Sequence, residues 1–306
     1  MNEIIKTEGL TKHFGKVKAV ENISLNVQKG EIYGFLGLNG AGKTTTIRML
    51  LGMIGPTSGK SWLFGKEVNA GSTSLWEKVG YLVEVPYGWP ELTVSENLEI
   101  FRRMRFIKDK KCVNTIMEKL KIDRYHDRKA KHLSLGNAQR LGLAKALIHN
   151  PEILILDEPA NGLDPAGIVE IREMLHDLAF NQGVTIFVSS HLLNEISKFA
   201  TRIGIIHEGK FILESGIHEL DVQRYRKLHV KTGKKDETKE LLAKLGYSIK
   251  NSENGVLEIT GLDSIDKPEN IAKLLVEKEL SPSLLKVEEE DLEAFFLRTI
   301  KTGGVK

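Results

Sequence analysis

Short apolar runs alternate with longer amphipathic stretches through the first two-thirds of the chain. Ile32–Leu36, Ile153–Leu156 and Thr185–Val188 are almost wholly apolar, as is typical of strands covered on both faces of a sheet. Alternating stretches at Ile4–Leu10 and Ile23–Val27 predict an antiparallel β-subdomain before the first buried strand. The pattern indicates an α/β domain.

Between Ser95 and Lys131 the pattern becomes helical. The candidate core positions of this stretch are Leu98, Phe101, Ile116, Leu120 and Ile122. We therefore expect a helical insertion over about residues 85–150, inside a first domain that covers residues 1–217.

After Gly216 the composition turns to Lys and Glu, and the periodicity predicts the order β-α-β-β-α-β. The expected elements are strands at Leu228–Lys231, Tyr247–Lys250, Val256–Thr260 and Leu284–Val287, and helices at Lys235–Leu245 and Pro268–Leu280. This order is typical of a small α+β, ferredoxin-like domain. We assign it to residues 218–306, with a closing helix around Leu292–Ile300.

Composition limits the classes of function. With 306 residues, 28% of them charged and 41% hydrophobic, the chain can bury one large core and a smaller second one. A formal charge of +3 is too small to indicate a nucleic-acid partner. No apolar run approaches the roughly 18–20 residues that span a bilayer, and the start lacks the regions of a signal peptide, so we expect the chain to stay inside the cell. Cys112 is the single cysteine, which argues against redox chemistry.

A phosphate-binding loop is the first chemical motif. Its pattern G-x-x-x-x-G-K-[ST] follows an apolar strand and precedes a helix, and it consists of Gly37, Leu38, Asn39, Gly40, Ala41, Gly42, Lys43 and Thr44, with Thr45 next in the helix. The backbone N–H groups and the helix N-terminus would face the phosphates of ATP. Lys43 would neutralise the β and γ oxygens, and the Thr44 hydroxyl would ligate Mg²⁺. The alternative is a chance glycine-rich turn.

Two carboxylates end the apolar strand at Ile153–Leu156. Side chains alternate direction along a strand, so Asp157 and Glu158 serve different purposes. We predict that Asp157 holds Mg²⁺ and that Glu158 polarises the water that attacks the γ-phosphate. Alone, such a pair is equally consistent with a solvated strand end; together with the loop at Lys43, it favours ATP hydrolysis.

Three further motifs resemble those of ABC ATPases. Leu133–Arg140 (LSLGNAQR) resembles the signature motif, Asn161–Pro165 the D-loop, and Ser190-His191 the switch histidine. Phe14 is similar to the aromatic residue that stacks on adenine, although an aromatic residue at such a place is also consistent with a core position. The motifs follow the family's order over roughly residues 3–216. The resemblance implies a P-loop NTPase fold of the ABC ATPase type.

The resemblance also implies a composite site between two copies in a nucleotide-dependent homodimer. ATP on the phosphate loop of one copy would be covered by Ser134, Gly136 and Asn137 of the other. Asp164 would link the two sites, and His191 would contact the γ-phosphate. A separately encoded membrane permease is the implied partner, which places the chain at the cytoplasmic face of the membrane.

Two departures from the common family pattern stand out. Glu84 occupies the position at which most of these ATPases carry a glutamine that senses Mg²⁺, and we expect tighter dependence on the metal. Leu135 replaces a glycine of the signature motif, and Asn137 a glutamine. With the C-terminal extension, these features resemble the bacitracin-resistance and lantibiotic-immunity group of exporters.

The cargo and the partner surface leave alternatives open. The chain is equally compatible with an exporter ATPase for another cargo. A non-transport ABC ATPase fits less well, because no coiled coil or tandem nucleotide domain appears in the sequence. A module that only binds nucleotide also fits less well, because both Glu158 and His191 are present. Tyr87 and Trp89 are candidate anchors for the permease. Ordinary packing of their loop is the alternative.

Overall fold

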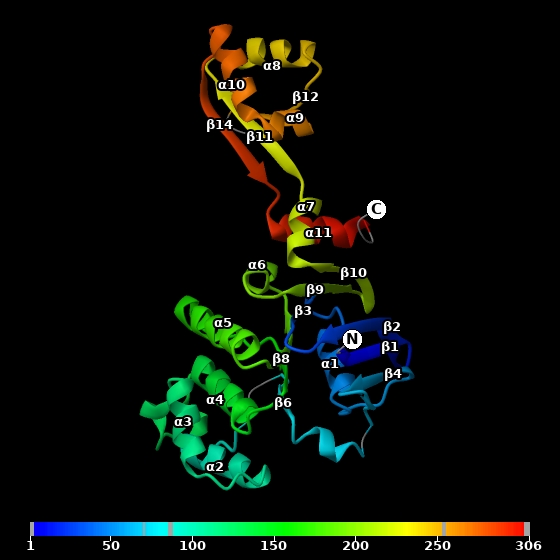
Figure 1. Ribbon diagram of the computed structural model, residues 1–306, viewed down its shortest axis with the longest axis vertical. Helices are drawn as coiled ribbons and strands as arrows, with labels where there is room; N and C mark the ends of the chain where they lie inside the picture. The colour runs from blue at the N-terminus through cyan, green and yellow to red at the C-terminus, as the bar shows by residue number, and fades with distance from the viewer. Residues whose placement is uncertain (1–2, 70, 85–87, 253–254, 303–306) are drawn as a thin grey trace. The chain divides into compact units, whose positions relative to one another are not determined.

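The computed structural model describes residues 3–69, 71–84, 88–252 and 255–302 (Figure 1). The chain divides into two compact units, of which unit 1 comprises Met1–Ile217 with Thr299–Lys306 and unit 2 comprises His218–Arg298. Among the described residues, no helix combines the length and the apolar character needed to cross a bilayer.

A six-stranded sheet forms the centre of unit 1, in the order β10-β9-β3-β8-β7-β6. Its strands are β3 (Ile32–Leu36), β6 (Val79–Leu82), β7 (Ile153–Asp157), β8 (Thr185–Ser190), β9 (Arg202–His207) and β10 (Lys210–Gly216). The neighbours from β9 to β6 are parallel, and β10 pairs antiparallel with β9. Every residue of β3, β7 and β8 is buried, which explains why these strands are mostly apolar, with polar residues at strand ends: Asp157, Thr185, Ser189 and Ser190.

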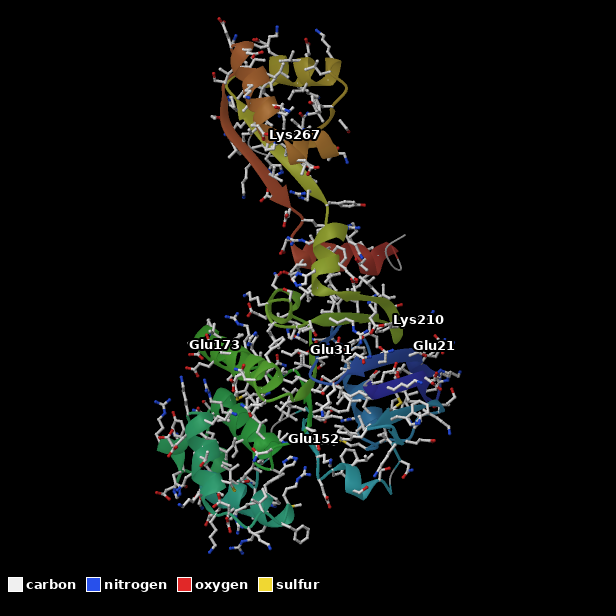
Figure 2. The ribbon with its side chains drawn as sticks, in the orientation of Figure 1. Glu21, Glu31, Glu152, Glu173, Lys210 and Lys267 are labelled. Atoms are coloured by element: carbon white, nitrogen blue, oxygen red, sulfur yellow. The ribbon has the colours of Figure 1, made fainter. Side chains whose placement is uncertain are left out.

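An antiparallel sheet of order β2-β1-β4-β5 covers one side of unit 1. It consists of β1 (Glu3–Phe14), β2 (Val17–Gln28), β4 (Ser58–Leu63) and β5 (Lys66–Glu67). Helix α1 (Lys43–Leu50) lies on the same side, and its Ile47 and Leu50 are buried in the shared core (Figure 1). The Glu21 N–H donates to Gly209 O (2.7 Å), and Glu21 and Lys210, both labelled in Figure 2, form an ion pair at 3.9 Å.

Helices cover the other side of the central sheet. They are α2 (Val94–Met104), α3 (Lys111–Lys119), α4 (Leu135–Leu147), α5 (Pro165–Phe180) and the short α6 (Leu193–Ile196), with 3₁₀ turns at Thr73–Leu75, Asp123–Tyr125 and Ala130–His132. A capping box of Thr93 and Glu96 starts α2. Leu98, Ile116, Leu120 and Ile122 are buried as predicted. Phe101 is only partly buried, because it faces a groove described below.

Unit 2 has the predicted ferredoxin-like order. Its elements are β11 (Arg226–Thr232), α8 (Lys235–Lys244), β12 (Ser248–Asn251), β13 (Leu257–Thr260), α9 (Leu262–Asp266), α10 (Pro268–Glu277) and β14 (Pro282–Glu289); α7 (Ile217–Gln223) and α11 (Leu292–Thr302) cross its boundaries. The sheet is antiparallel throughout, in the order β12-β13-β11-β14. Leu242 of α8 and Leu275 of α10 pack on Val230 and form its core. The short helix α9 was not predicted.

Candidate active site

The phosphate-binding loop lies between β3 and α1, at the carboxyl edge of the central sheet. Lys43 is buried and its ammonium donates to Gly37 O (2.7 Å), so the lysine folds back over its own loop. Gly42 has φ 107°, and a Cβ there would lie 2.5 Å from Ala19 O, so no side chain fits. Leu38, Asn39 and Gly40 are exposed, Ala41 is buried and Thr45 is half-buried. The middle of the loop is therefore open to solvent, where a phosphate could reach it.

The first turn of α1 is joined to the end of β7. The Thr44 hydroxyl donates to Asp157 Oδ2 (2.7 Å), and the Ser189 hydroxyl donates to Asp157 Oδ1. Asp157 is 3% exposed. Hydroxyl and carboxylate oxygens are the ligands that Mg²⁺ takes, and Mg²⁺ is commonly held by one or two carboxylates together with substrate phosphates.

Glu158 lies at the centre of a cluster of charged side chains. Lys43 Nζ is 3.1 Å from Glu158 Oε1, and His191 Nδ1 is 2.8 Å from Glu158 Oε2. The residue has φ 50°, a left-handed conformation that is uncommon for a residue with a Cβ. Its N–H donates to the Ser189 backbone oxygen (3.2 Å) and hydroxyl (3.1 Å), so β8 supports this turn. The structure thus brings Lys43, Glu158 and His191 together.

The signature residues form a separate surface. Ser134 is the N-cap of α4 and its hydroxyl accepts the Asn137 N–H, while Asp164 is the N-cap of α5 and accepts the Gly167 N–H (2.9 Å). A cavity of about 600 Å³ opens here, lined by Ser134, Leu135, Gly136, Asn137 and Gly162–Asp164 among others. The residues that line it include none from the phosphate loop. Helix starts with free N–H groups attract anions.

Phe14 and Glu84 have partners other than the residues described above. The Phe14 ring is 50% exposed, with the Lys12 ammonium 5.1 Å from its centroid, so Phe14 is not a core residue. Glu84 follows β6 and pairs with Arg48 of α1.

Sequence reasoning missed two supporting residues. Ser189 holds Asp157 and the Glu158 backbone, and Gln139, which is 3% exposed, donates to Glu158 O (3.2 Å). Asp157 and Ser189 are paired across β7 and β8, and this register cannot be read from the sequence. Gln139 lies inside the signature motif, but its distance from Glu158 in the sequence conceals the contact.

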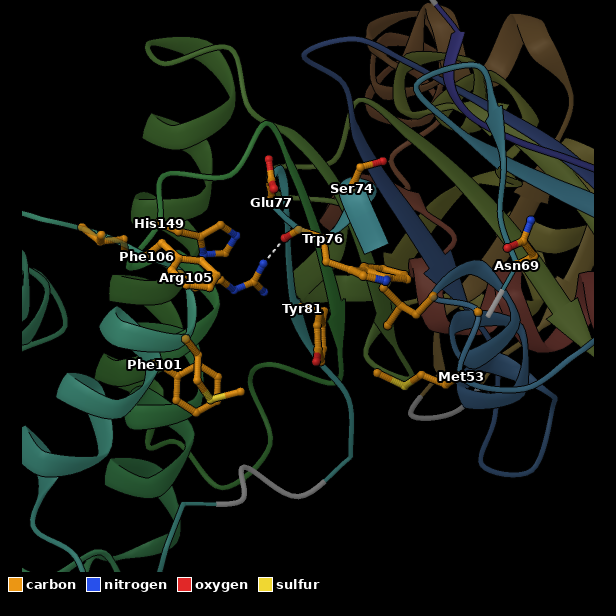
Figure 3. Close-up of a pocket in the computed structure, with 14 residues that line it drawn as sticks. Met53, Asn69, Ser74, Trp76, Glu77, Tyr81, Phe101, Arg105, Phe106 and His149 are labelled. Carbon is orange, nitrogen blue, oxygen red and sulfur yellow. Dashed lines mark hydrogen bonds between the residues drawn. The ribbon is translucent and has the colours of Figure 1, made fainter. Parts of the chain in front are cut away.

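A groove lies between α1, β6 and α2, with a volume of about 920 Å³ (Figure 3). Its lining is largely apolar and includes Met53, Trp76, Tyr81, Phe101, Met104 and Phe106, of which Met104 is 62% and Phe106 90% exposed. Arg105 and His149 also line it, and Figure 3 shows the Arg105 guanidinium directed at the Trp76 carbonyl, to which it donates. Burial and the Arg105 charge lower the pKa of His149 to about 4.

Trp89 lies at the edge of α2, and the other predicted anchor, Tyr87, lies outside the described residues. The Asn97 side chain forms two hydrogen bonds with the Trp89 backbone. The Trp89 N–H donates to Asn97 Oδ1 (2.7 Å), and Asn97 Nδ2 donates to Trp89 O (3.1 Å). The indole meets Phe101 edge-on at 5.9 Å and stays 42% exposed.

Comparison with known proteins agrees with this geometry. The profile of the family described as ABC transporter matches residues 20–161. The bacitracin transport ATP-binding protein BcrA of Bacillus licheniformis is 39% identical over the whole of both chains. The lantibiotic transport ATP-binding protein SrtF of Streptococcus pyogenes is 38% identical over 69% of this chain and 90% of its own.

Solved structures show the same fold. A dimeric post-hydrolysis state of the ATP-binding cassette MJ0796 with ADP and Pi matches with a TM-score of 0.65 and 26% identity, over 70% of this chain and 99% of that one. A second dimeric structure of MJ0796, described as a bacterial ABC transporter cassette, matches with a TM-score of 0.66 and 25% identity, again over 70% of this chain and 99% of that one. The chain therefore belongs to the ATP-binding subunits of ABC transporters and is an ATPase.

Proposed function

We propose that the chain hydrolyses Mg-ATP at the cluster around Glu158. The observation that carries this proposal is that Glu158 contacts Lys43 with one oxygen and His191 with the other, beside the bonded pair of Thr44 and Asp157. On ATP binding, Lys43 exchanges Glu158 for the β and γ oxygens, which frees the carboxylate to accept a proton from water. His191 then contacts the γ-phosphate. Mg²⁺ held by Thr44, Asp157 and Glu84 would neutralise charge on the phosphates.

We further propose that a second copy completes the site. The surface of Ser134, Gly136 and Asp164 presents helix starts that the phosphate loop of the same chain does not occupy. Facing the loop of a partner, the Ser134 hydroxyl and the Gly136 N–H would bind the γ-phosphate, and Asn137 would lie in the same contact. The dimeric cassettes similar in fold support this arrangement.

The proposed cargo is a membrane-active antimicrobial peptide of the bacitracin or lantibiotic kind. The similarity to the bacitracin transport proteins covers the entire chain, C-terminal unit included, in both Bacillus licheniformis and Enterococcus faecalis. The chain would then act at the cytoplasmic face of the membrane, in self-immunity or resistance.

The groove of Figure 3 is the proposed docking surface for a cytoplasmic helix of the membrane permease. It has a volume of about 920 Å³ and exposes Met104 and Phe106, and the Trp89 ring packs edge-on against Phe101, one of its lining residues. Aromatic and Met side chains are enriched at protein–protein interfaces. Replacing Tyr87 and Trp89 by Ala should weaken co-purification with the permease while ATP binding is retained; undiminished co-purification contradicts the proposal.

The proposed cargo is tested by measuring resistance to antimicrobial peptides. The chain is co-expressed with the permease genes that neighbour its own in a peptide-sensitive bacterium, and the minimal inhibitory concentrations of bacitracin and of a lantibiotic are measured. We expect a rise that Glu158→Gln abolishes. An active ATPase that docks on its permease but confers no resistance to either peptide identifies it as an exporter ATPase for another cargo.

A further inference from the structure

Helix α1 binds two carboxylates one turn apart. Thr44 and Arg48 are spaced i, i+4 and so lie on one face of the helix. The Thr44 hydroxyl donates to Asp157, and the Arg48 guanidinium donates to Glu84 Oε1. Arg48 and Thr44 therefore each donate a side-chain hydrogen bond from α1 to a carboxylate, Arg48 to Glu84 and Thr44 to Asp157.

The two carboxylates also come from neighbouring strands. β6 and β7 are parallel, and Leu82 is paired with Leu156. Asp157 is one residue and Glu84 two residues beyond that pair, so both lie at the carboxyl edge where Mg²⁺ is proposed to bind. Arg48 thus places a positive charge at this edge on the carboxylate that stands in the family's magnesium-sensing position.

The backbone turns at Glu84, where the side chain contacts Arg48. Val83 packs against the main core, and Glu84 then turns the chain with φ 58°, a left-handed conformation. The side chains of Arg48 and Glu84 are 37% and 46% exposed. An ion pair with this exposure contributes a factor of about two to five in an equilibrium constant, which a divalent cation can outcompete.

We infer that Arg48 is a positioning residue for Glu84. In the nucleotide-free protein Arg48 holds the Glu84 carboxylate against α1, and Glu84 exchanges Arg48 for the metal when Mg-ATP is bound. The inference rests on the proposed function for the second half of this exchange only. The first half is a property of the free protein.

The first arm of the experiment uses nucleotide-free, metal-free protein. Amide hydrogen exchange of residues 83–84 and 88–92 should be faster by about two- to five-fold in Arg48→Gln and in Glu84→Gln, with no further increase in the double variant. Arg48→Lys, which keeps the charge, should restore most of the protection. The matched control is Lys78→Gln, which removes the 2.6 Å pair of Lys78 with Glu152 (labelled in Figure 2) at the opposite ends of strands β6 and β7 and should leave the hydrogen exchange of these residues unchanged.

The second arm measures Mg-ATP binding as Mg²⁺ is titrated into proteins that carry Glu158→Gln, at one fixed ATP concentration. With its competitor removed, Arg48→Gln should lower the half-saturating Mg²⁺ concentration about two- to five-fold, and should have no effect when Glu84 is Gln. The inference would be overturned if Arg48→Gln had equal effects in both backgrounds, or if it left the hydrogen exchange of residues 83–84 and 88–92 unchanged. Failure of the proposed function is distinguishable, because then the wild type binds no Mg-ATP while the first arm is unaffected.

Discussion

The phosphate loop and the signature surface hold their functional side chains in different ways. Lys43 and His191 each contact Glu158, and Asp157 is buried between Thr44 and Ser189. Ser134 instead caps a helix and is exposed, and its neighbour Leu135 is 59% exposed. One region thus has its side chains paired within a single chain, whereas the other presents an exposed surface that we propose a second copy completes.

Loss of the Glu158 carboxylate should have the largest effect and tests the first region. Glu158→Gln removes the proposed general base, so steady-state ATP hydrolysis should fall by about 10²–10⁴-fold. Lys43 and the phosphate loop are retained, so Mg-ATP binding should persist. Phosphate release and equilibrium nucleotide binding measure the two effects, and a variant that keeps wild-type turnover would assign the base elsewhere.

A carboxylate on the signature surface tests the second region. Gly136→Asp places a negative charge where the partner's γ-phosphate is proposed to lie, and hydrolysis should fall by about 10²-fold or more. Nucleotide binding by the single chain should change little, because Gly136 lines a cavity without phosphate-loop residues. Weakened binding by the monomer would show that the two regions are not separate.

The pH dependence of stability separates the fold from both regions. The pKa of His149 is lowered to about 4, whereas the unfolded chain takes up this proton near pH 6.5. Between these values the unfolded state binds more protons, so stability falls as the pH falls. The loss should reach about 1–2 kcal/mol at pH 5 relative to His149→Gln. Thermal melts of the wild type and of His149→Gln from pH 7 to 5 measure this loss of stability. If the stabilities of the two proteins changed in parallel with pH, the buried neutral imidazole would be contradicted.

The smallest effect concerns the support of Asp157. Ser189→Ala removes the hydroxyl that donates to Asp157 Oδ1, and should weaken the apparent Mg²⁺ affinity about ten-fold. Ser190→Ala is the matched control, since the Ser190 hydroxyl accepts the Leu192 N–H instead. Equal responses of the two variants to Mg²⁺ would show that Ser189 merely packs.

The sequence reveals features that local patterns determine. Gly37 to Thr44 are contiguous, and the ferredoxin-like order of unit 2 follows from periodicity, so both were predicted. The contacts of Ser189 with Asp157 and of Arg48 with Glu84 join residues more than thirty positions apart, and depend on strand pairing that no local pattern encodes. Helix α9 is five residues long, too short for its periodicity to identify.

The most direct test of a site shared between two chains mixes two inactive variants. Lys43→Ala damages the phosphate loop and Gly136→Asp the signature surface, so each variant alone forms only defective sites. In a mixed dimer, one site pairs the intact loop of one chain with the intact signature of the other. We predict that the mixture recovers ATPase activity that neither variant shows alone. A mixture as inactive as its components, or full activity of either variant by itself, would contradict the shared site.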